Sequence, residues 1–105
     1  MESTDIVINR EIGQLLYDVA PDDARKIIMR AKLVDEGDVG EFEFDYENEK
    51  GDVNWFASTG KTNSRLLDLL ERHRAFFVSQ NQSPWKACTV TIDVETGKFS
   101  MNLKY

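Results

Sequence analysis

The chain has 105 residues, of which 41% are hydrophobic and 30% are charged, and its formal net charge is -6. This length and composition predict a single globular domain over residues 1–105, which can bury a core without disulfides or metal ions. Nine of the 19 acidic residues fall within residues 35–52, where Lys50 is the one base. Such a charge distribution argues against nucleic acid as a ligand, because phosphate binding needs lysine and arginine.

The cysteine content and the apolar runs indicate which cellular compartment to expect for the protein. Cys88 is the one cysteine, which excludes an internal disulfide and fits a reducing compartment such as the cytoplasm. The first residues contain no basic segment followed by a long apolar run, so we do not expect secretion by a standard signal peptide. Apolar runs stay shorter than a membrane span, so we expect no membrane partner.

The first two predicted elements are a helix and a strand. The helix is capped by Ser3 or Thr4 and ends at Pro21. Its apolar residues recur at spacings of three and four and form one stripe: Ile8, Ile12, Leu15, Leu16 and Val19. Gly13 lies within this helix and lowers its propensity. A strand is predicted over residues 26–34, with alternate apolar residues on one face: Ile27, Met29, Ala31 and Leu33.

A loop over residues 35–39 leads into a strand over residues 41–47, where carboxylates and aromatics alternate without a break. A period of two predicts one buried face and one solvent face. Neighbouring carboxylates would lie about 6.7 Å apart and repel by roughly 0.6 kcal/mol per pair in water. This acidic row either meets a positively charged surface or is a solvated face that Arg30 and Lys32 of the preceding strand partly neutralise.

The second half of the chain predicts the rest of the sheet and a second helix. Its elements follow in chain order: a turn over residues 49–52, a third strand over 53–57, a helix from a cap at Asn63 or Ser64 to about Asn81, and strands over 86–94 and 98–105. Short connections favour antiparallel neighbours. The order therefore predicts an α+β fold, in which two helices pack on one face of a five-stranded antiparallel sheet.

The residues that could support catalysis or bind metal complete no known motif. Gly60-Lys61-Thr62 resembles the end of a phosphate-binding loop, but Trp55 stands where that loop needs its first glycine. His73 and Cys88 are expected to be buried structural residues, and one of each excludes a classical zinc site. We predict no catalytic residue, no metal site and no cofactor. A small enzyme that binds magnesium or calcium at the acidic strand stays open as an alternative.

The predicted binding site is the acidic segment together with one aromatic anchor. Its members carry negative charge, except for the last, which carries a large ring: Asp35, Glu36, Asp38, Glu41, Glu43, Asp45, Glu47, Glu49, Asp52 and Trp55. Trp55 and Trp85 fit either the core or an interface, and the core is the default for large aromatics. A basic protein is the partner that this segment would steer.

Several segments also match the pattern of a known family: Ala20-Pro21-Asp22-Asp23, Lys26-Ile27-Ile28-Met29-Arg30-Ala31, Leu66-Leu67-Asp68-Leu69-Leu70, Phe77, Trp85, Thr89-Val90-Thr91-Ile92, Gly97-Lys98-Phe99 and Tyr105. In these residues the chain resembles the YezG-like immunity (antitoxin) family, over roughly residues 12–34 and 62–105. Ala24 departs from the pattern, because family members tend to carry tryptophan there.

The resemblance implies a function without catalysis. An immunity protein of this kind binds and neutralises a cognate toxin domain, often a nuclease, inside the bacterial cytoplasm. Polymorphic toxins and contact-dependent growth inhibition are the expected setting. An adaptor domain for another basic protein is the remaining alternative.

Overall fold

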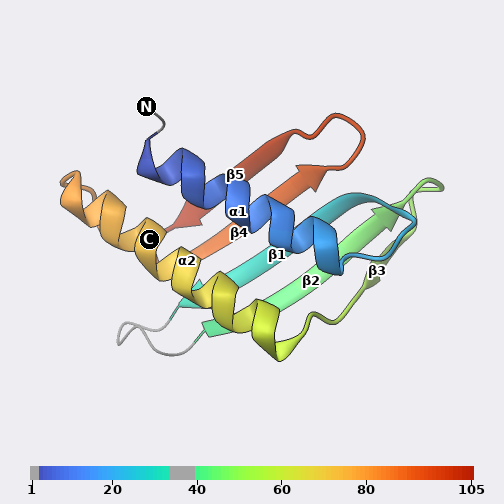
Figure 1. Ribbon diagram of the computed structural model, residues 1–105, viewed down its shortest axis with the longest axis horizontal. Helices are drawn as coiled ribbons and strands as arrows, with labels where there is room; N and C mark the ends of the chain where they lie inside the picture. The colour runs from blue at the N-terminus through green and yellow to red at the C-terminus, as the bar shows by residue number, and fades with distance from the viewer. Residues whose placement is uncertain (1–2, 34–39) are drawn as a thin grey trace.

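The computed structural model describes residues 3–33 and 40–105, which form two helices packed on one face of a five-stranded sheet (Figure 1). The elements follow in chain order: α1 (Thr4–Val19), β1 (Ala24–Leu33), β2 (Gly40–Asn48), β3 (Val53–Trp55), α2 (Gly60–Ser79), β4 (Ala87–Asp93) and β5 (Phe99–Lys104). The strand order is β3-β2-β1-β4-β5, and each neighbouring pair is antiparallel. The predicted α+β fold is confirmed.

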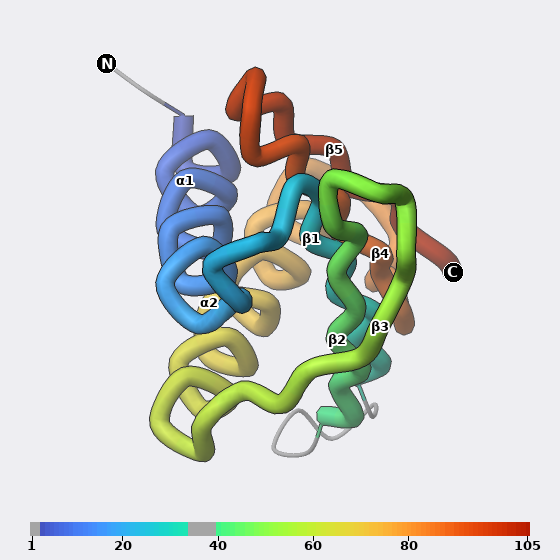
Figure 2. The backbone as a smooth tube through the Cα atoms, turned by 90° about the vertical axis from the view of Figure 1, so that its right-hand side faces the viewer, coloured from blue at the N-terminus to red at the C-terminus, as the bar shows by residue number. Residues whose placement is uncertain are grey.

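The core lies between the helices and one face of the sheet. In β1 the alternate residues predicted to be buried are buried, and Phe44 of β2 joins them. The helices and β4 supply the rest of the apolar contacts: Ile8, Ile12, Leu16, Leu66, Leu69, Leu70, Cys88, Val90 and Ile92. Burying one such aliphatic side chain is worth about 1.5–3 kcal/mol. This burial free energy holds both helices on one face of the sheet. Figure 2 shows the sheet edge-on, with no described helix on its other face.

The hydrogen bonds at the starts of the two helices differ from the predicted caps. Ser3 occupies the N-cap position of α1, but its hydroxyl donates to Asp5 Oδ1 at 2.6 Å instead of capping the backbone. The predicted cap of α2 at Asn63 or Ser64 was wrong. The hydroxyl oxygen of Thr59 accepts from the Thr62 N–H at 3.0 Å and so starts the helix at Gly60.

Several strand bounds also differ from the prediction. Strand β3 ends at Trp55 and not at residue 57, because the chain leaves β2 after Phe56 and runs toward α2 (Figure 2). Strand β1 begins at Ala24 and includes an irregularity between Ala24 and Lys26. Gly51 and Gly97 lie in the turns after β2 and β4 with φ of 84° and 73°, which only glycine adopts without strain.

A buried polar contact joins α2 to the segment before β4. Trp85 is 0% exposed and His73 is 2% exposed, and the indole N–H of Trp85 donates to Nδ1 of His73 at 3.2 Å. The neutral imidazole therefore carries its proton on Nε2. Burial lowers the pKa of His73, and a weaker attraction to Asp5 opposes it. Burial also raises the pKa of the Cys88 thiol to about 12. Both residues are buried, as predicted.

In the described ranges, neither helix is long and apolar enough to span a membrane.

Candidate interaction surface

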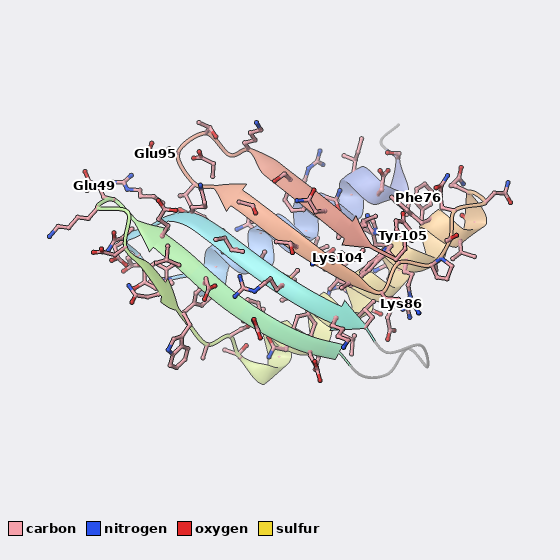
Figure 3. The ribbon with its side chains drawn as sticks, turned by 180° about the vertical axis from the view of Figure 1, so that it is seen from behind. Glu49, Phe76, Lys86, Glu95, Lys104 and Tyr105 are labelled. Atoms are coloured by element: carbon pink, nitrogen blue, oxygen red, sulfur yellow. The ribbon has the colours of Figure 1, made fainter. Side chains whose placement is uncertain are left out.

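The acidic row of β2 lies on the uncovered face of the sheet. The aromatic residues between its carboxylates face the helices, where Phe44 is buried and Phe42 and Tyr46 pack against the core. Because side chains alternate along a strand, the acidic residues must point the other way. Figure 3 views this face and shows side chains standing on it without a helix above them. This packing confirms the predicted orientation, in which the aromatic residues of β2 face the core and the acidic row faces solvent.

Strand β1 places positive charges beside this row. Arg30 stands opposite Glu43, and its guanidinium donates to Glu43 Oε2 at 3.1 Å and to Asp45 Oδ2 at 2.5 Å. The bond to Asp45 and then the bond to Glu43 raise the pKa of Arg30. Lys26 Nζ lies 3.9 Å from Glu47 Oε2. The predicted pairing with Arg30 is confirmed, and one guanidinium between two carboxylates leaves the trio with a net charge of -1.

The turn after β2 carries two more of the predicted acidic residues. The side-chain oxygen of Asn48 accepts from the backbone N–H groups of Lys50 and Asp52, each at 3.0 Å, which fixes the turn. Glu49 is 82% exposed, 3.7 Å from Arg25. Arg25 also bonds Glu95 of the neighbouring turn at 3.1 Å. Figure 3 shows Glu49 and Glu95 at one end of the sheet and Lys86 at the other.

Trp55 lies on the uncovered face, so placing it in the core by default was wrong. It pairs with Asp45 across the β2–β3 ladder, which puts both side chains on the same face, and its side chain is 78% exposed. Val53, two residues earlier on the same face, is 56% exposed. Among the described residues, no strand or helix covers this face of edge strand β3, so a large apolar ring stays in contact with water.

A groove of about 410 Å³ runs beside Trp55 toward the start of α2. Its walls combine the ring of Trp55 with Arg30, Asp45, Phe56, Ser58 and Asn63. The Ser58 hydroxyl and the Asn63 side-chain oxygen are buried and make no hydrogen bond within the described residues. Buried oxygens without partners are uncommon and accept donors readily. The groove therefore offers an aromatic face and carboxylates to a hydrogen-bond donor.

Sequence reasoning missed Ser58 and Asn63, which it assigned to a loop and to a helix cap. No sequence signal marks an unbonded oxygen, because hydrogen bonding depends on the tertiary neighbours. Three of the predicted site residues, Asp35, Glu36 and Asp38, lie outside the described residues. The structure thus brings together the β2 row, Trp55 and the acidic turn with Glu49 and Asp52.

Across residues 3–33 and 40–105, no three histidine, cysteine or acidic side chains gather as a metal ion requires. His73 and Cys88 are buried in the core. The Cys88 thiol, with its raised pKa, stays protonated near neutral pH and is a poor nucleophile.

No protein-family model matches the chain, and no curated protein matches it closely enough to count.

Proposed function

We propose that the protein is an immunity protein, which binds and neutralises a cognate toxin domain with a basic surface, a nuclease for example, in the bacterial cytoplasm. The observation that carries the proposal is the exposed Trp55 on an uncovered sheet face, next to the partly neutralised carboxylate row. An exposed aromatic flanked by charge is typical of interface anchors. The resemblance of the sequence to YezG-like immunity proteins supports the same function.

The surface favours a partner rich in arginine and lysine. An incoming guanidinium can stack on the Trp55 ring while it donates to Asp45, and such a cation–π contact is worth about 0.5–2 kcal/mol. Glu49 and Asp52, at the exposed turn, speed the encounter with a positive surface over about one Debye length. A nuclease binds phosphate and carries such a surface.

The surface can be tested with two variants that spare the fold. Trp55→Ala removes the anchor from an edge strand, and Asp52→Lys reverses a charge whose turn is held by backbone bonds to Asn48. Each variant is co-expressed with the toxin domain encoded beside the gene, and growth and binding kinetics are measured. We expect Trp55→Ala to weaken binding by about 2 kcal/mol, or roughly 30-fold. We expect Asp52→Lys to slow association mainly at low salt.

Matched controls lie on the helix layer. Val78→Ala removes another exposed apolar side chain, and Asp18→Lys reverses another exposed charge, so both should protect like the parent. If Trp55→Ala and Asp52→Lys also protect fully, the uncovered face is not the toxin-binding surface. If the parent binds a basic protein that is not a toxin and gives no growth protection, the chain is an adaptor domain.

A further inference from the structure

Strand β5 is an open edge of the sheet, opposite to the Trp55 edge. The Asp93 N–H donates to the Lys98 carbonyl at 2.9 Å, which fixes the hydrogen-bonding parity of the β4–β5 ladder. Along an antiparallel edge strand, alternate residues turn their backbone groups inward and outward. The backbone N–H and C=O groups of Phe99, Met101 and Leu103 therefore point away from β4, toward solvent. An edge of this kind can pair with an added strand.

The side chains of Phe99, Met101 and Leu103 are half-buried and face the helix layer, because they pair with core residues of β4. Phe99, at the start of β5, also lines a groove of about 390 Å³ against α1. Ile6, Gly13 and Tyr17 supply its apolar wall, and Asn9, Arg10 and Gln14 supply polar groups. Ile6 is 49% and Tyr17 is 59% exposed. A strand added to β5 would direct the side chains that lie beside Phe99 into this groove.

The packing of the fold does not require glycine at position 13. It lies inside α1, where glycine is less favourable than alanine. Its φ is not in the left-handed region, and a Cβ atom there would lie 3.7 Å from Phe99 Cδ2 and 3.9 Å from Ile92 Cδ1, which is ordinary contact. Alanine would thus fit and strengthen the helix. Glycine at this position keeps the groove open, and such local conflicts mark functional places.

The positive charge of β5 favours one kind of strand at this edge. Residues 98–104 carry two charges, Lys98 and Lys104, both positive, in a chain with a net charge of -6. A second copy paired antiparallel along the whole edge, with Met101 opposite Met101, would set Lys98 against Lys104 twice. Like charges directly opposite each other destabilise a strand pair. A partner strand with carboxylates on its outward face would instead meet these lysines favourably.

We infer that the β5 edge and the α1–β5 groove form a second binding site, which takes an extended peptide segment of a partner protein by strand addition. The segment alternates apolar residues, which enter the groove beside Gly13, with acidic residues, which lie next to Lys98 and Lys104. Backbone hydrogen bonds to Phe99, Met101 and Leu103 hold the segment, and the groove and the lysines select its sequence. This site is independent of the Trp55 surface.

The probe is a blocked synthetic peptide about eight residues long, the length of an ordinary strand, in which valine alternates with glutamate and threonine. Its binding to the full chain is followed by fluorescence anisotropy and by amide NMR shifts. We expect saturable binding, with the largest shifts at Phe99, Met101 and Leu103. A matched peptide with lysine in place of glutamate should bind about tenfold more weakly or less. Equal binding of both peptides, or no binding of either, would overturn the inference.

Three variants separate binding at this site from non-specific binding. Gly13→Leu fills the groove and should weaken the acidic peptide about tenfold or more. Met101→Pro removes an outward N–H without removing a bond to β4, and proline is tolerated at such edge positions, so it should abolish binding while the chain stays folded. Gly13→Ala should raise Tm by several degrees and still reduce binding.

Trp55→Ala serves as the control and should bind the acidic peptide as the parent does. Sedimentation tests the other occupant. A stable dimer in which hydrogen exchange protects the β5 edge would show that a second copy occupies it, and would overturn the proposal of a partner segment.

Discussion

The two tryptophans of the chain lie in opposite surroundings. Trp85 is fully buried under α2, where its ring meets His73 edge-on with the centroids 5.8 Å apart. Trp55 stands on an edge strand of the uncovered face and is 78% exposed. The same side chain therefore stabilises the core in one region and stays available for contact in the other. Coverage by the helices, and not residue type, therefore decides the role of each tryptophan.

Replacing the buried tryptophan should change the stability most. Trp85→Ala should lower the free energy of unfolding by about 3–5 kcal/mol, because it leaves a large cavity. It also leaves Nδ1 of His73 without its donor. Urea unfolding followed by circular dichroism measures the loss. A change below about 1 kcal/mol would contradict the packing described around Trp85.

A smaller effect tests how the uncovered face balances its charges. Arg30→Gln removes the base between Glu43 and Asp45, and should destabilise the fold by about 1 kcal/mol or less, since Arg30 is partly solvated. The same change leaves the face more negative, so a basic partner should associate faster at low salt. A loss of stability together with faster association would show that Arg30 stabilises the fold, while the acidic row attracts the partner. Slower association would count against steering by these carboxylates.

A pH series probes the buried half again. The pKa of His73 is lowered below its ordinary value of 6.5, mainly by burial, so below that pH the unfolded chain binds more protons than the folded chain. Stability should therefore fall as the pH drops below 6.5, and it should be constant with respect to this group at higher pH. Thermal melts between about pH 7 and pH 5 measure the slope, before most carboxylates titrate.

His73→Gln provides the control for that series, because the amide does not titrate. Its melting temperature should vary less over the same range than that of the parent. An equal slope in parent and variant would assign the pH dependence to other groups.

The smallest expected effect concerns the stability contribution of Trp55. Trp55→Ala should change the free energy of unfolding by less than about 0.5 kcal/mol, as surface substitutions usually do. Acrylamide quenching sharpens the contrast: the emission of Trp55 should be quenched strongly in Trp85→Phe, and that of Trp85 weakly in Trp55→Phe. Similar quenching of both would mean that Trp55 is covered in solution.

Much of the fold could be predicted because apolar periodicity is a direct consequence of burial. The spacing in α1 and the alternation in β1 and β2 identified the buried faces, and the register followed with Arg30 beside Glu43 and Asp45. The start of α2 could not be predicted, since Thr59 and Asn63 are both good caps and the tertiary path decides between them. The environment of Trp55 could not be predicted either, because alternation gives the face of a residue but not what covers that face.

The position of β1 in the sheet has a consequence for how the chain acquires its structure. This strand is flanked by β2, which follows it closely, and by β4, where Lys26 meets Asp93 from the far end of the sequence. Its second ladder cannot form until β4 has been synthesised and has emerged from the ribosome. Topologies with such distant pairings close slowly. During translation, the edge of β1 that pairs with β4 therefore stays open for longer than the edge that pairs with β2.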